Sequence, residues 1–303
     1  MTHTFAAGGT HQQLAQLGFL VVQVGHRGGT PERSKAYASY GYGNLRDYGL
    51  EDKKTALEQL ADRHPFVDLE RVGIFGHSGG GFMTAAALLQ EPYNRFFKVG
   101  VASAGNHDNN IYNQNWAERW HGLREVPASR PGAESRAAQS RPGSRASEQG
   151  SGEVRQGSRQ GGRRGGRRGG DEADLDDDGD LGDATLDVVA QESRQTQGNG
   201  QERQTGAGTK FEIKVPTNAE LAAGLQGHLL LVHGEIDNNV HPANTMRLVD
   251  ALIRANKRFD LLIIPGARHS FGAAQGYFQQ RMFEYFVQHL LGETPRGADI
   301  LRK

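Results

Sequence analysis

The stretch RVGIFGHSGGGF, residues 71–82, decides the fold. An apolar run with β-branched residues ends at a Gly-x-Ser-x-Gly pentapeptide centred on Ser78, and an alanine-rich segment follows. A buried strand, a tight glycine turn and a helix in this order place the turn at the carboxyl edge of a parallel sheet. The pattern indicates a strand-to-helix elbow that carries a nucleophilic serine, with the N–H of Gly79 directed at a developing oxyanion.

The turn also has interpretations that involve no catalysis. A serine in this position can begin and cap the following helix, as in many nucleotide-binding loops. A phosphate-binding loop is excluded more directly, because no Gly-Lys-Ser or Gly-Lys-Thr follows the glycines. The motif by itself leaves open whether Ser78 is a nucleophile or a capping residue, and the choice depends on the rest of the chain.

Apolar runs and helical patterns alternate along the chain outside one long segment. Runs typical of buried strands lie at residues 19–24, 72–75, 96–101, 229–232 and 261–264. Helical patterns lie at residues 50–64, 79–90, 242–256 and 277–291. This alternation predicts an α/β fold with a mostly parallel sheet and right-handed crossovers.

Residues 127–209 break the pattern, because they contain no Phe, Tyr, Trp or Lys and consist mainly of Gly, Ser, Arg, Gln, Ala and Asp. Such a composition cannot bury enough apolar surface to offset the loss of chain entropy. We therefore expect a low-complexity, disordered insertion. It divides one α/β domain into a first part, residues 1–126, and a second part, residues 210–303.

Two functional interpretations of this insertion compete with that of a solvated linker. The tract GGRRGGRRGG resembles arginine-glycine segments that bind RNA, but it lacks aromatic residues and acidic residues follow it at once. The tract DLDDDGD begins like a calcium loop, but Thr185 stands where the bidentate glutamate is required. A solvated polyampholyte is the default expectation, with no nucleic-acid partner.

The composition of the 303 residues narrows the functional classes further. The formal net charge is zero, which argues against a protein that binds polyanions over its whole surface. The absence of cysteine excludes disulfides, thiolate metal sites and cysteine nucleophiles. No apolar run reaches about 18 residues, and the first residues do not resemble a signal peptide. No membrane partner is expected, and the compartment stays undetermined.

A nucleophilic serine requires a base and an orienting carboxylate, and on this fold they follow in the order Ser, Asp, His. Asp237 comes soon after the predicted strand at 229–232, in a loop at the edge where parallel sheets bind ligands. His269 follows the next predicted strand in the same way. We therefore predict that Asp237 orients His269 and that His269 accepts the proton of Ser78.

The segment HGEIDNNVH also suggests a metal site, formed by His233, Glu235, Asp237 and His241. It lacks the helical i, i+4 pair and the usual ligand spacings, so neither a metal nor a cofactor is predicted. His233 is expected to support the end of its strand. His77 is expected to pack beside the site, because a base adjacent to the nucleophile in sequence would point away from it on so tight a turn.

Three motifs, GHSGGG, LLLVHGEIDNNVHPANT and PGARHSFG, together resemble the catalytic domain of the prolyl oligopeptidase family of serine peptidases, in particular its dipeptidyl peptidase IV-like branch. The resemblance covers residues 10–291 apart from the insertion. It implies an α/β-hydrolase fold with Ser78, Asp237 and His269 as the catalytic triad. It also implies hydrolysis of peptide bonds after proline or a small residue near a free N-terminus, through an acyl-enzyme.

The resemblance further implies a substrate pocket. The segment YNQNWAERWHG matches the family segment that lines the proline pocket with aromatic rings, which assigns Tyr112 and Trp116 to it, although both would also suit a core. Asn239 matches an asparagine that helps to bind a substrate carbonyl. Peptide substrates are the expected partners. A homodimer stays open, because members of the family often dimerise.

The chain departs from the family pattern at its beginning. In the family, a β-propeller that grips the substrate's amino terminus precedes the hydrolase domain, and a tyrosine-bearing loop supplies a second oxyanion donor. Neither is found here, so the sheet is expected to be incomplete at its N-terminal side. The lack of one oxyanion donor costs about 2.7–4 kcal/mol of transition-state stabilisation. An esterase of the same fold and a catalytically impaired fragment therefore stay open as alternatives.

Overall fold

The computed structural model describes residues 9–29, 32–122, 124–127, 209–212 and 215–293. The chain divides into two units, the first made of residues 1–125, 180–200 and 211–303, and the second of residues 126–179 and 201–210. Strands β3 (Arg124–Pro127) and β4 (Thr209–Glu212) form a two-stranded sheet. The predicted insertion, residues 127–209, lies almost entirely outside the described residues.

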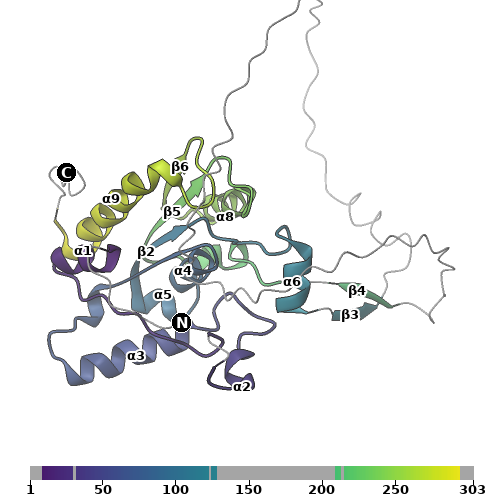
Figure 1. The fold of residues 1–303 in the computed structure, drawn as a ribbon, viewed down its shortest axis with the longest axis horizontal. Helices are drawn as coiled ribbons and strands as arrows, with labels where there is room; N and C mark the ends of the chain where they lie inside the picture. Colours follow the sequence, from purple (N-terminus) through teal and green to yellow (C-terminus); the bar gives the residue numbers. More distant parts are fainter. Residues whose placement is uncertain (1–8, 30–31, 123, 128–208, 213–214, 294–303) are drawn as a thin grey trace, which may run out of the picture. The chain divides into compact units, whose positions relative to one another are not determined.

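A parallel sheet of four strands in the order β1-β2-β5-β6 forms the centre of the first unit (Figure 1). The strands are β1 (Val72–His77), β2 (Phe97–Ser103), β5 (His228–Gly234) and β6 (Asp260–Ile264). His77 pairs with Ser103, and Ser103 pairs with Val232, so the strands end at one edge. The loops that follow these strands therefore meet where open α/β sheets bind their ligands.

Helices cover both faces of the sheet (Figure 1). On one face pack α3 (Leu50–Arg63), α4 (Gly79–Leu89) and α8 (Ala243–Arg254), and on the other α1 (Thr10–Gln16) and α9 (Gln275–Phe286). Along β5, Leu229 and Leu231 belong to the first core cluster, whereas Leu230 and Val232 belong to the second. This alternation follows from the two-residue period of a strand, and it explains why the strand is apolar throughout.

Shorter elements complete the described chain: α2 (Lys35–Ala38), η1 (Leu69–Arg71), α5 (Tyr93–Phe96), α6 (Gln114–His121), η2 (Ala219–Gly224), η3 (Gly272–Ala274) and the π-helical turn η4 (Val287–Leu291). Among the described residues, no helix is long and apolar enough to cross a membrane. The predicted helices and the last four predicted strands are confirmed, with ends that differ by a few residues.

The prediction of a buried strand at residues 19–24 is wrong. These residues have no regular secondary structure, and Leu20 and Val22 are 54% and 38% exposed. Phe19 and Val21 pack against the core cluster on the α9 side. The segment thus partly buries two alternate side chains, but its backbone joins no strand ladder within the described part of the chain. An apolar run indicates that side chains pack against a core. It does not indicate whether the backbone forms hydrogen bonds with a neighbouring strand.

The turn between β1 and α4 has the close backbone contacts that its glycines suggest. A Cβ atom on Gly76 would lie 2.4 Å from the carbonyl oxygen of Gly80, and one on Gly81 would lie 2.5 Å from that of Ser103. Between them, Ser78 has φ 55° and ψ −121°, in a region that non-glycine residues rarely adopt. The N–H of Ser78 donates to the Ser103 carbonyl at 2.9 Å, which ties the turn to β2.

We expect Gly76→Ala to destabilise the fold, because the new methyl group meets backbone atoms of Gly80 that cannot give way. Overpacking of this kind costs about 1–3 kcal/mol of unfolding free energy. Urea unfolding followed by circular dichroism measures it. Gly80→Ala is the matched control, since its Cβ atom meets nothing within 4 Å and alanine favours the helix. Equal stability of the two variants would contradict the packing argument.

Candidate active site

The predicted site residues follow three strands at the carboxyl edge of the sheet. Ser78 comes directly after β1, Asp237 lies three residues beyond the end of β5, and His269 lies in the loop after β6. The imidazole rings of His269 and His77 are 4.7 Å apart, so the histidine loop reaches the residue that precedes Ser78. The structure thus brings all three loops to one place.

The Asp237 carboxylate is buried and receives hydrogen bonds on both oxygens. Its Oδ1 accepts from the backbone N–H groups of Asn239 and Val240, each at 2.9 Å. Its Oδ2 lies 2.7 Å from Nδ1 of His269 and 3.3 Å from Nε2 of His233. Two backbone donors and two imidazoles therefore fix both the position and the orientation of this side chain.

Burial alone would raise the pKa of Asp237, because it disfavours the charged form. The hydrogen bonds from His233 and His269 outweigh burial and hold the pKa below its usual value. The carboxylate is consequently ionised at neutral pH, although its side chain has no exposed surface. An ionised acceptor at Oδ2 requires that His269 carry its proton on Nδ1, which leaves Nε2 unprotonated in the neutral ring.

The side chain of His269 is 20% exposed, unlike that of Asp237. Its Nδ1 is engaged with Asp237, so only Nε2 is available to a reacting group. Within the described residues, no hydrogen bond joins Ser78 to His269. Before a substrate binds, catalytic hydrogen bonds are often long or poorly aligned, so the lack of this bond does not exclude a base that acts on Ser78.

His77 packs beside the site, as the sequence predicts. Its ring makes an edge contact with Phe271, at 5.5 Å between centroids. The Ser103 hydroxyl donates to the carbonyl of Gly76 at 3.2 Å, so the 2.9 Å contact between Ser103 Oγ and His77 Nδ1 is donated by the histidine. Burial lowers the pKa of His77 to about 4, which keeps its ring neutral.

The first backbone N–H groups of α4 are not capped by any side chain. The helix begins at Gly79, and its first internal bond runs from the N–H of Phe82 to the carbonyl of Ser78. Gly79 and Gly80 are exposed. An uncapped helix start beside the serine offers donors and a favourable dipole to a negative charge.

The residues expected in the substrate pocket also come together. Tyr112 donates a hydrogen bond from its hydroxyl to Oδ1 of Asn239 at 2.8 Å. Its ring meets that of Trp116 edge to face, at 5.4 Å between centroids. The Asn239 N–H donates to Asp237, so this aromatic pair is linked to the candidate triad. Both rings are partly exposed, whereas two aromatic rings in the core would be buried.

Sequence reasoning missed a buried polar network in the segment GNHDNN after β2. His107 is 1% exposed, and the N–H of Asn218 donates to its carbonyl at 3.0 Å. Asp108 pairs with Arg247 at 2.5 Å, and its N–H donates to the side chain of Asn244. Burial lowers the pKa of His107 to about 3. The only sequence signal was the density of asparagine.

The residues of the possible metal cluster make separate contacts. The Glu235 carboxylate accepts from the N–H of Gly266, and His241 Nδ1 accepts from the N–H of Ala243. Across the ranges that the structure describes, no group of three or more His, Asp or Glu side chains could hold a metal ion. Of the cluster, only His233 shares a contact with Asp237.

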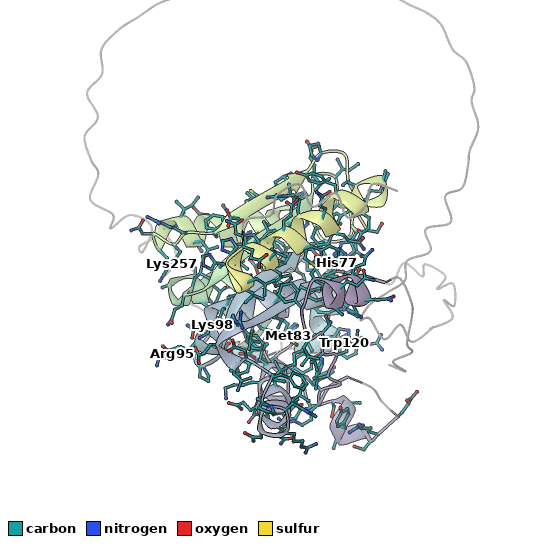
Figure 2. All side chains as sticks on the ribbon, turned by 90° about the vertical axis from the view of Figure 1, so that its left-hand side faces the viewer. His77, Met83, Arg95, Lys98, Trp120 and Lys257 are labelled. Carbon is teal, nitrogen blue, oxygen red and sulfur yellow. The ribbon has the colours of Figure 1, made fainter. Side chains whose placement is uncertain are left out.

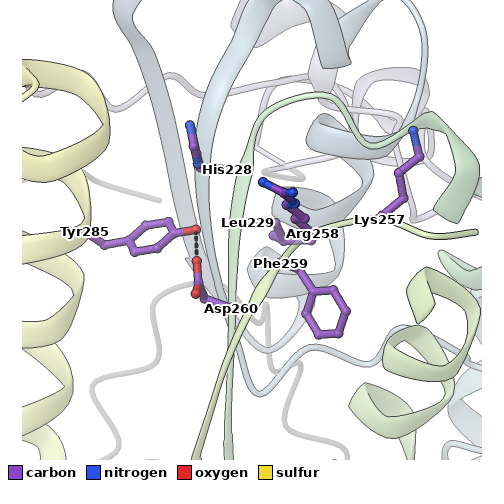
Figure 3. Close-up of a pocket in the computed structure, with 7 residues that line it drawn as sticks. All are labelled: His228, Leu229, Lys257, Arg258, Phe259, Asp260 and Tyr285. Carbon is purple, nitrogen blue, oxygen red and sulfur yellow. Dashed lines mark hydrogen bonds between the residues drawn. The ribbon is translucent and has the colours of Figure 1, made fainter.

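A pocket of about 460 Å³ lies at the opposite edge of the sheet, where β5 and β6 begin. Tyr285 donates to Asp260 inside it at 2.8 Å (Figure 3). Figure 2 shows Lys257, which lines this pocket, and His77 far apart on the molecule. Strands of this length separate the two edges by roughly 20 Å, so this pocket is not part of the site at Ser78.

A parallel sheet with a serine elbow after one strand, and a hydrogen-bonded Asp–His pair after two later strands, is the arrangement of the α/β-hydrolase fold. The model of the prolyl oligopeptidase family matches residues 6–141 and 183–293. The chain therefore belongs to the prolyl oligopeptidase family of serine peptidases, as its motifs predicted. Residues 142–182, between the two matched segments, lie inside the predicted insertion.

Individual relatives agree with this assignment. Dipeptidyl peptidase 8 of Homo sapiens is 25% identical over 279 residues, which are 91% of this chain and 22% of that protein. Venom dipeptidyl peptidase 4 of Vespula vulgaris is 34% identical over 97 residues, 32% of this chain and 12% of that protein. The crystal structure of Porphyromonas gingivalis dipeptidyl peptidase 4 shares the fold, with a TM-score of 0.52 and 22% identity over 85% of this chain and 25% of that one. The chain thus spans about a quarter or less of each relative.

The buried neutral His77 makes the stability of the fold depend on pH. The unfolded chain binds a proton at this residue near pH 6.5, whereas the folded protein binds it only near pH 4. Between these values the unfolded state holds more protons, so the free energy of unfolding falls as the pH falls. We expect His77→Phe to reduce this slope by about 1 kcal/mol per pH unit.

Urea unfolding at a series of pH values from 7 to 4.5 measures the slope. His64→Phe is the control, because it removes an exposed histidine that lies outside the site. A slope that is the same in His77→Phe and in the wild-type chain would show that His77 is not held neutral.

Proposed function

We propose that this chain is the catalytic domain of a serine peptidase that uses Ser78 as nucleophile, His269 as general base and Asp237 as the orienting carboxylate. The observation that carries the proposal is the 2.7 Å contact between Asp237 Oδ2 and His269 Nδ1. It lies beside the Ser78 elbow, at the edge of the sheet where such sites are found. Membership of the prolyl oligopeptidase family supports the same three residues.

In the proposed reaction, Nε2 of His269 accepts the proton of Ser78 while Oγ bonds to the scissile carbonyl carbon. The carbonyl oxygen becomes an oxyanion, which the N–H of Gly79 stabilises. When the C–N bond breaks, the imidazolium gives its proton to the leaving amine, and the acyl group remains on Oγ as an ester. Water then loses a proton to His269, attacks this ester, and releases the acid while Ser78 regains its proton.

Asp237 supports both halves of this reaction electrostatically. Its ionised oxygen holds the His269 tautomer in which Nε2 can accept a proton, and it lies next to the positive charge that forms on the ring. The hydrogen bonds that keep the carboxylate ionised also prevent it from taking the proton itself. The carboxylate can therefore remain an anion throughout the reaction.

We further propose that the substrate is a peptide cleaved after proline or a small residue near its N-terminus. The edge-to-face pair of Tyr112 and Trp116 offers flat apolar area suited to a proline ring. The hydrogen bond from Tyr112 fixes Oδ1 of Asn239. The side-chain NH2 group of Asn239 can then donate to a substrate carbonyl. The relatives named dipeptidyl peptidases support a peptide as the substrate.

Labelling with a fluorophosphonate tests whether Ser78 is activated. We expect the wild-type chain to become covalently modified at Ser78 and the Ser78→Ala variant to stay unmodified, because only an activated serine attacks the phosphorus centre. Mass spectrometry of the tryptic peptide measures the modification. Ser103→Ala is the control, since Ser103 is a buried neighbour with a hydroxyl that is already bonded. A wild-type chain that remains unlabelled would overturn the proposed nucleophile.

Comparison of substrates tests the peptidase assignment separately, because a triad by itself does not choose between amides and esters. We expect the chain to hydrolyse Gly-Pro-anilide, and to lose kcat/KM for it in the Trp116→Ala variant, which removes half of the aromatic pair. Release of the aniline measures the rate. Hydrolysis of short acyl esters without any hydrolysis of Xaa-Pro anilides would instead identify an esterase. Labelling without turnover of either substrate would indicate a catalytically impaired chain.

A further inference from the structure

The Asp237 carboxylate contacts a second imidazole that the proposed mechanism does not use. His233 lies on β5, and no part of its side chain is exposed. Its Nε2 lies 2.7 Å from the carbonyl oxygen of Val240 and 3.3 Å from Oδ2 of Asp237. Its Nδ1 lies 2.7 Å from the hydroxyl of Thr245 in the first turn of α8. Both ring nitrogens are therefore engaged.

The partners of His233 determine which nitrogen carries the proton. A carbonyl oxygen can only accept, so Nε2 must donate to Val240. In the neutral ring Nδ1 then accepts from the Thr245 hydroxyl, which can donate. His233 is thus held in one tautomer whose N–H faces Val240 and Asp237. It has no nitrogen free for a substrate, so it cannot replace His269 as the base.

The contacts of Val240 connect this tautomer to the orientation of Asp237. The N–H of Val240 donates to Oδ1 of Asp237, while its carbonyl oxygen accepts from His233. The backbone of one residue is therefore held from both sides, by the carboxylate and by the imidazole. Val240 is 1% exposed, so no water competes for these groups at its surface. Without the His233 N–H, the carbonyl oxygen of Val240 would lose its hydrogen bond, and only the N–H of Val240 would still be held.

We propose that His233 is a positioning residue for the triad: it fixes the turn from Asp237 to Val240 and thereby aims Oδ2 at Nδ1 of His269. This inference rests on the proposed function, since it assigns His233 a role in the activation of Ser78. Catalysis is sensitive to such positions, because a shift of about 1 Å in a supporting group can cost on the order of 100-fold in rate.

Two substitutions at His233 separate the hydrogen bond from simple space filling. His233→Gln keeps an N–H at a distance along the side chain similar to that of Nε2, so it can still donate to Val240. His233→Met has a similar length and no donor. We expect His233→Met to slow fluorophosphonate labelling of Ser78 by on the order of 10- to 100-fold, and His233→Gln to stay near the wild-type rate. With Gly-Pro-anilide, kcat should fall by the same factor, and any rise in KM should be smaller, because Asn239 lies on the same turn.

Circular dichroism and urea unfolding establish that each variant is folded before its rate is compared. If His233→Met does not fold, Thr245→Val carries the test, because it removes the hydroxyl that orients the ring, with Thr245→Ser as the control that keeps it. We expect Thr245→Val to slow labelling by about threefold or more and Thr245→Ser to leave it unchanged.

The outcomes distinguish this inference from the proposed function. An unlabelled wild-type chain would mean that the function itself is wrong. A labelled wild-type chain with an equal labelling rate in folded His233→Met would leave the nucleophile in place and overturn the role of His233. Equal losses in His233→Gln and His233→Met would also overturn it, because shape and not the donated hydrogen bond would then be what matters.

Discussion

Close packing between β1 and the start of α4 is the constraint on which the rest of the site depends. Gly76 lies so near to the backbone of Gly80 that no side chain fits between strand and helix. The chain must reverse within one residue, and Ser78 does so with a left-handed φ. In consequence the serine, the uncapped start of a helix and the carboxyl edge of the sheet coincide at one point. Asp237 and His269 need only follow neighbouring strands to reach it.

Hydrogen bonds stabilise the buried charge at this edge. Asp237 is ionised although burial opposes it, because backbone N–H groups and the His269 imidazole donate to its oxygens and the N–H of His233 lies close to Oδ2. Burial lowers the pKa values of His77 and His107, so neither adds a positive charge nearby. A proton moved onto His269 during a reaction would place a positive charge next to this carboxylate, which is the condition for transition-state stabilisation.

The parts of the site that the sequence predicted are those with a local signature. Asp237 and His269 each follow an apolar run, and a parallel sheet brings such positions together without any knowledge of side-chain contacts. The network after β2 has no such signature, because Asp108 meets Asn244 across 136 residues of chain. The segment at residues 19–24 failed for the opposite reason. Its apolar pattern is local, but burial and strand formation both depend on a neighbouring backbone, which the pattern does not describe.

The pocket and the triad share one hydrogen-bonded path. Tyr112 donates to the side chain of Asn239, whose own N–H donates to Asp237, and Asp237 accepts from His269. A substrate ring that displaced Tyr112 would therefore act on the turn that carries the carboxylate. Val240 and His233 hold the same turn from its buried side. The turn of residues 237–240 is thus a structural link between the proposed pocket and the proposed triad.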